Sequence, residues 1–272
     1  MIIAVQNLST LISSRDAYDM TLLVNRQARD HVAPAWGIRP PQVEFLPVAP
    51  SALALPAGHA TPRFDAIIGI MDDADQAGAL GWHAEGPDAS VYGRVFARPV
   101  LDNGGDALAA ALSVCSVLSH EVAEVIGDSA CNRWAQRADG LLVAMELADP
   151  VEGDSYRLAI SAASGEQVAG TVSDFVLPSW FDPDASAGAT DFMGLVTAPF
   201  QVRPAGYAII MSAGSISEQW GEQYPEWRRA TKDSPLARTY RRAGRPVPLL
   251  LSGSYPGITS GIPARVQWSP TT

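Results

Sequence analysis

The sequence predicts an α+β fold, with a sheet and helices in the first 150 residues and a β-rich half after them. Three features support this prediction. Apolar runs of strand length alternate with helical patterns in the first part, a long apolar helix stands near the middle, and short strands separated by Gly, Pro and Asp turns follow it. Of the 272 residues, 47% are hydrophobic and 18% are charged, which is typical of a globular protein.

The first half begins with a strand and a helix. The helix begins after Ser13 or Ser14, and its apolar residues repeat every four positions up to Pro34, where we expect it to end. An acidic turn over residues 72–75 and a segment broken by Gly and Pro from residue 81 come later. The predicted strands of this half cover residues 2–5, 43–48, 64–71 and 90–97.

The central helix is predicted from an apolar run, Leu108 to Leu118, and we expect the helix to continue to about Ile126. Asp106 is its predicted cap, and Gly127 is a natural stop. A buried helix of this kind should present apolar side chains throughout. Its second half instead carries a histidine and two glutamates within five positions.

These polar residues follow a metal-binding pattern. His120 and Glu124 are four positions apart and project from one helix face, whereas Glu121 points about 100° away. This is the HExxH metallopeptidase geometry with glutamate in place of the second histidine. Two ligands one turn apart can hold a single ion, and Glu121 can then take a proton from metal-bound water. The alternative is a satisfied polar cluster or an exposed helix face, although charged groups in apolar helices are seldom buried unless paired or metal-bound.

The chain resembles bacterial zincin-like proteins that carry an HExxExxxDP helix followed by an acidic ExxD segment. The first motif is matched by His120, Glu121, Glu124 and Asp128, with Ser129 in place of proline, and the second by Glu146 and Asp149. The resemblance covers about residues 60–150 and implies a zincin fold, in which a mixed sheet packs on two helices. It also implies a single zinc ion and peptide-bond hydrolysis. In that fold the strand before the metal helix borders the substrate cleft, and we expect residues 90–97 to be this edge strand.

A catalytic zinc site needs three protein ligands and a water. His120 is the first, and Glu146 is the expected third. Glu124 is the second ligand, or a group that supports a ligand if Asp128 or Glu146 completes the set. Asp149 is either the alternative third ligand or the group that orients it. Asp128 follows His120 by eight positions, so it is a ligand, a support for a ligand, or a turn residue at the helix end.

Two more residues are candidates for stabilising an oxyanion. His83 and Tyr92 flank the predicted cleft, and the alternative for each is a packed or surface residue. Zinc is the expected metal. Manganese or iron remain open, because two carboxylates and one imidazole form an oxygen-rich set that lowers the net charge of the site.

We predict three segments: a zincin-like metal-binding domain at 1–150, a β-rich extension packed on it at 151–227, and a basic Pro/Gly-rich arm at 228–272. The expected strands of the extension are 156–160, 167–172, 175–177 and 207–211. Residues 213–227 are polar and place three aromatic side chains at near-helical spacing.

The arm differs from the rest of the chain in charge. Residues 228–245 carry seven basic side chains against one acidic one, although the whole chain has a net charge of −10. We expect the arm to pair with the acidic body or to bind an acidic partner protein. Nucleic acid is disfavoured as a partner, because no aromatic platform or recognised binding motif accompanies the basic residues.

The sequence predicts a cytoplasmic protein outside the membrane. No apolar run reaches the ~18–20 residues that span a bilayer, and the N-terminus lacks the basic region of a signal peptide. Two cysteines, Cys115 and Cys131, do not make a disulfide framework.

The sequence leaves two candidate functions. The first is a metal-dependent hydrolase, a zinc metallopeptidase that acts on a peptide or protein substrate and uses Glu121 to activate metal-bound water. The second is a non-catalytic interaction or assembly protein on a degenerate zincin scaffold, with its aromatic half and basic arm as contact surfaces.

Overall fold

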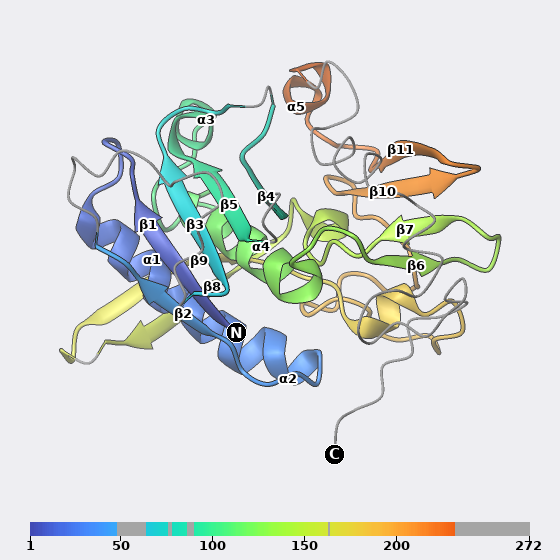
Figure 1. The fold of residues 1–272 in the computed structure, drawn as a ribbon, viewed down its shortest axis with the longest axis horizontal. Coiled ribbons are helices and arrows are strands. Elements are labelled where there is room, and N and C mark those ends of the chain that lie inside the picture. The colour runs from blue at the N-terminus through green and yellow to red at the C-terminus, as the bar shows by residue number, and fades with distance from the viewer. Residues whose placement is uncertain (48–63, 76–77, 86–89, 163, 232–272) are drawn as a thin grey trace.

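The computed structural model describes residues 1–47, 64–75, 78–85, 90–162 and 164–231. These residues form an α+β protein, as the sequence predicts, with strands in sheets of five, four and two. Figure 1 shows the five-stranded sheet on one side of the molecule, the four-stranded sheet on the other, and the central helix between them. Among the described residues, no helix combines the length and the apolar character needed to cross a membrane.

The five-stranded sheet has the order β2-β1-β3-β5-β4. Four of its strands are parallel, and β4 at one edge runs antiparallel to β5. Almost every side chain of β3 is buried, which is typical of the central strand of a parallel sheet. The strands are β1 (Ile2–Asn7), β2 (Gln42–Phe45), β3 (Ala66–Met71), β4 (Gly81–Glu85) and β5 (Val91–Phe96).

The edge strand of the five-stranded sheet is not the one that was expected. Residues 90–97, expected at the edge of the cleft, form mainly β5, and β5 lies between β3 and β4. The edge strand is β4, in the segment whose Gly and Pro residues predicted an irregular connection. Those residues cluster near the end of this segment, so the five positions from Gly81 to Glu85 are free to pair with β5.

The first helix also extends beyond its expected end. Helix α1 (Ser14–Gln27) is capped by Ser13, whose side chain accepts a hydrogen bond from the Asp16 backbone N–H. It continues through a π-helical turn (Ala28–Val32) into α2 (Ala33–Ala35). Pro34 therefore lies within this continuous helical segment, which ends one residue later at Ala35. A further short helix, α3 (Ala97–Asp102), follows β5.

The central helix, α4 (Val114–Asp128), begins later than predicted. Ser113 and Ser116 form a capping box, in which each side chain accepts the other's backbone N–H at 3.0 Å. The residues before it are not helical, because the Asp106 carboxylate accepts the backbone N–H groups of Ala109 and Ala110 and fixes a turn there.

The end of α4 also differs from the prediction. Gly127, the expected stop, lies inside the helix, which continues to Asp128. A Cβ atom at position 127 would lie 2.0 Å from Cδ1 of Leu147. The glycine is therefore a point of close packing, where the segment that carries Glu146 and Asp149 approaches α4.

A two-stranded hairpin and a second sheet complete the fold. The hairpin of β8 (Ser155–Ser161) and β9 (Gln167–Ser173) packs on α1 and α4, so both helices lie between it and the large sheet. The second sheet has the order β11-β10-β7-β6 and takes strands from both sides of residue 150. Its strands are β6 (Trp134–Gln136), β7 (Leu142–Ala144), β10 (Tyr207–Ser212) and β11 (Ser215–Trp220).

Two segments of this half differ from what their sequence pattern suggests. Residues 215–220 belong to the polar stretch in which Trp220, Tyr224 and Trp227 have near-helical spacing, but they form strand β11, because they pair with the apolar strand β10. Residues 175–177 form only an isolated bridge, between Val176 and Asp191. The remaining short elements are the 3₁₀ turns η2 (Asp149–Val151) and η3 (Pro178–Phe181) and helix α5 (Glu226–Thr231). The basic arm beyond residue 231 lies outside the described residues.

Candidate metal centre

Helix α4 carries its polar residues into the interior. His120 is 6% exposed, Glu121 and Asp128 are each 1% exposed, and Glu124 is fully buried. The helix is covered by the large sheet, the β9 hairpin strand and the apolar cluster around β7. Apart from the pocket that His120 and Glu121 line, α4 has no solvated face for these charges, so they must be compensated inside the protein.

The first group of metal-ligand atoms is formed by His120, Glu124 and Asp149. Nε2 of His120 lies 3.0 Å from Oε1 of Glu124 and 3.1 Å from Oδ1 of Asp149. Asp149 is the first residue of η2 and is fully buried. Of the two downstream acids expected near the metal, Glu146 and Asp149, it is Asp149 that lies beside His120.

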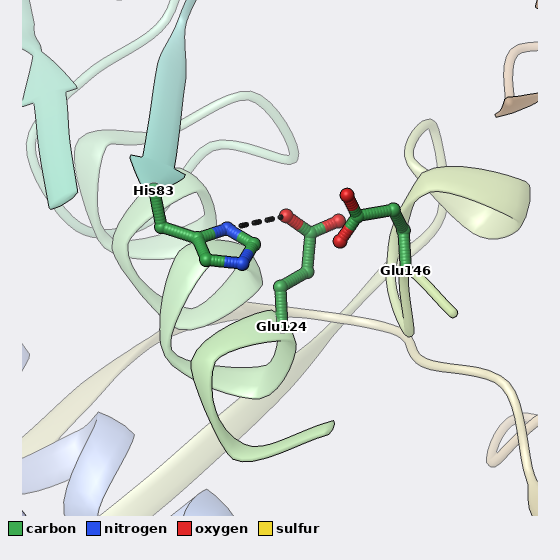
Figure 2. A group of neighbouring side chains, drawn as sticks. All are labelled: His83, Glu124 and Glu146. Atoms are coloured by element: carbon green, nitrogen blue, oxygen red, sulfur yellow. Dashed lines mark ion pairs between the residues drawn. The ribbon is translucent and has the colours of Figure 1, made fainter. Parts of the chain in front are cut away.

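The second group is formed by His83, Glu124 and Glu146. Figure 2 shows the Glu124 carboxylate between the His83 ring, which comes from β4, and the Glu146 carboxylate on the other side. Nδ1 of His83 lies 3.3 Å from Oε2 of Glu124. His83 is fully buried and Glu146 is 1% exposed. Glu146, expected as the third ligand beside His120, therefore belongs to the group with His83, and Glu124 belongs to both groups.

The orientation of the His83 ring is fixed by a backbone contact. Its Nε2 lies 3.2 Å from the carbonyl oxygen of Asp128. A carbonyl can only accept, so Nε2 carries the hydrogen and Nδ1 faces the carboxylates. The Cys131 thiol donates to the carbonyl of His83 at 3.5 Å, which ties β4 to the turn after α4.

Both histidines are surrounded by acids. Burial disfavours the charged form of His120, but the charge of Glu124 and the bonds to Asp149 and Glu124 outweigh it, and its pKa is well above the ordinary value. Burial likewise opposes the charge of His83, while Cys131, Glu121 and Glu124 raise its pKa. The site thus attracts positive charge strongly, and a divalent cation can replace the protons.

Glu121 belongs to neither ligand group and lies beside a pocket. Its Oε2 is 3.4 Å from Nδ1 of His83. With His120 it lines a pocket of about 290 Å³, whose other walls include Gly81 at the start of β4 and Glu152. A Cβ atom at position 81 would lie 2.6 Å from Oε1 of Glu121, so the carboxylate is held directly against the edge strand.

Two sequence candidates lie elsewhere. The Asp128 carboxylate accepts the backbone N–H groups of Asn132 at 3.1 Å and Arg133 at 2.8 Å, so it shapes the turn after α4. Tyr92 pairs with Ala84, one position from the His83–Gly93 pair, and therefore projects from the opposite face of the sheet. There its ring packs edge-on against Trp82 at 5.4 Å, away from the expected cleft.

Two features of this centre were not predicted from the sequence. His83 was expected to stabilise an oxyanion, but its Nδ1 lies among the ligand carboxylates. The pocket wall also includes Glu152 and Arg228, which form an ion pair. A lone histidine flanked by Trp82 and Ala84 was the only local signal for a buried imidazole.

Comparisons with protein-family models, with curated proteins and with solved structures gave no match to this chain. The function must therefore be argued from the geometry of the site.

Proposed function

We propose that this chain is a metal-dependent hydrolase of the zincin type, which cleaves peptide bonds. The observation that carries the proposal is a buried His120–Glu124–Asp149 group beside Glu121, at the wall of a pocket that β4 borders. One imidazole and two carboxylates suit zinc, and also manganese or iron.

The arrangement of the sheet supports the zincin assignment. Four parallel strands and one antiparallel edge strand pack on α1 and α4. The metal-ligand helix α4 comes after β4, β5 and α3 in the chain. This agrees with the mixed sheet and two helices that the HExxE motif implies. The edge of β4 that faces away from β5 pairs with no other strand among the described residues. An extended peptide could add to it through backbone hydrogen bonds.

Each residue of the site has a defined task in this proposal. His120, Glu124 and Asp149 would hold the ion, and a bound divalent ion would polarise a carbonyl and lower the pKa of water. Glu121 accepts the proton of the attacking water and returns it to the leaving amine. Its place against Gly81 keeps it within reach of a peptide on β4. Asp128 supports the site through its carbonyl, which orients the His83 ring.

A Glu121→Gln variant tests the proposal. The side chain keeps its size and one acceptor oxygen but can no longer take a proton, so cleavage should fall by about 10²–10⁴-fold. Wild type and variant would be loaded with the same metal, checked for equal metal content, and compared on a mixed peptide library by mass spectrometry. Equal cleavage, or none by either protein, would favour the non-catalytic scaffold.

A further inference from the structure

We propose that the centre holds two metal ions, with a second ion bound by His83, Glu124 and Glu146 and with Glu124 as the bridge. The inference deepens the proposed function and rests on it only for the first ion, at His120. It follows from two ligand groups that share one carboxylate.

The His83 ring supports the second site independently of the acids around it. Its Nε2 donates to a backbone carbonyl, which leaves Nδ1 as the metal-binding atom of the neutral ring. Nδ1 is buried and forms no hydrogen bond of regular geometry among the described residues. It nevertheless lies 3.3 Å from Glu124 and 3.4 Å from Glu121. Because it faces carboxylate oxygens, Nδ1 must carry either a proton or a cation, and a bound metal ion would take the place of the proton.

The distances agree with coordination. Ligand atoms about 2.1 Å from a tetrahedral zinc ion are roughly 3.3–3.4 Å apart. Nδ1 of His83 and Oε2 of Glu124 are 3.3 Å apart. On the other side, Nε2 of His120 is 3.0 Å from Oε1 of the same glutamate. Glu124 thus turns one oxygen toward each histidine, as a bridging carboxylate does in sites where two ions are about 3.5–4 Å apart.

The charge of the centre also favours two ions. Glu121, Glu124, Glu146 and Asp149 are at most 1% exposed, and they surround two imidazoles. Two divalent ions would supply more of the positive charge that these buried acids attract than one ion does. A second ion would lower the cost of burying the acids, so it stabilises the folded centre.

The two positions differ in access. His120 lines the pocket, whereas His83, Glu124 and Glu146 are absent from its described walls. The ion at His120 would face the substrate. The ion at His83 would be enclosed, and it would hold Glu124 and strand β4 in place and increase the positive potential at the outer position.

Metal stoichiometry tests this inference separately from hydrolysis. The chain would be stripped with chelator, titrated with zinc by calorimetry, and analysed for bound metal after gel filtration. We expect two ions per chain for wild type, one for His83→Ala, and two for the matched control His31→Ala, whose ring stacks on Phe192 outside both groups. One ion in wild type, or a stoichiometry unchanged by His83→Ala, would overturn the inference.

A second variant and a second readout test the inference if His83→Ala fails to fold. Glu146→Gln keeps the shape of the side chain and should also reduce the stoichiometry to one. With manganese, the bridged pair should give the electron paramagnetic resonance signal of two coupled ions, and isolated-ion spectra at full loading would contradict a bridge. Two ions without any peptidase activity would refute the proposed function and leave this inference intact, whereas activity with one ion would do the reverse.

Discussion

Replacing Gly127 by alanine tests how the close approach of Leu147 to α4 holds the metal ligands. The new Cβ would lie 2.0 Å from Cδ1 of Leu147 and 2.9 Å from its Cγ. Ordinary contacts between carbon atoms are about 3.5–4.0 Å, so the leucine must move. Leu147 is fully buried between Glu146 and Asp149, and its displacement therefore moves ligands of both groups.

The magnitude follows from two opposing effects. Alanine in place of glycine inside a helix stabilises by about 1 kcal/mol. Overpacking a core costs about 1–3 kcal/mol, and an overlap of this size belongs at the upper end. Gly127→Ala should thus lower the free energy of unfolding by about 2 kcal/mol and weaken metal binding.

The control is the same change in a Leu147→Ala background, measured by urea unfolding of the metal-free chains. Without the leucine methyl groups the overlap disappears, and the alanine should now stabilise by up to about 1 kcal/mol. The sign of the effect should reverse between the two backgrounds. An identical effect in both would refute the close-packing argument.

Three further predictions concern the site and its surroundings. Gly81→Ala should displace the Glu121 carboxylate and lower the peptide-cleavage kcat at least about tenfold with unchanged metal content; an unchanged kcat would contradict this contact. Burial and the neighbouring Asp191 raise the pKa of Asp174 to about 8, above its unfolded value, so the folded chain keeps a proton that the unfolded chain loses. The stability that this proton contributes is therefore lost as pH rises from about 4 to 8. The free energy of unfolding of Asp174→Asn, measured by urea titration, should equal that of wild type below both pKa values and should then exceed it by up to about 1.4 kcal/mol more for each pH unit. Stability curves that stay parallel across this pH range would refute the shift. Chelator should lower the Tm of wild type but not of His120→Ala/His83→Ala, because an ion bound only by the folded state stabilises it by about 2.7 kcal/mol at 100 times its Kd; equal shifts in a thermal scan would contradict specific binding.

Much of the fold follows from local pattern. The apolar strands β1 and β3 and the buried helix α4 were predicted, because long apolar runs and capping residues act over short distances. Element ends were less predictable. The start of α4 depends on a turn that the Asp106 side chain fixes, and the role of Gly127 depends on Leu147, twenty residues later in the chain.

The candidate site was also predictable only in part, because local spacing places some of its residues and long-range packing places the others. The spacing of His120, Glu121 and Glu124 defines one helical turn, so their proximity could be predicted from sequence. The partners of His120 and of His83 depend on how a strand and a turn pack on that helix. Register decides the rest: one position along β5 separates Tyr92 from the face of the sheet that carries His83.

Both proposals require that the buried histidines and carboxylates bind metal. The most direct test is the metal content of the wild-type chain, purified without chelator and supplied with zinc, beside His120→Ala. We predict bound zinc in wild type and the loss of at least one ion per chain in the variant. A wild-type chain that retains no metal after zinc is supplied would contradict it, and the hydrolase proposal would fall with it.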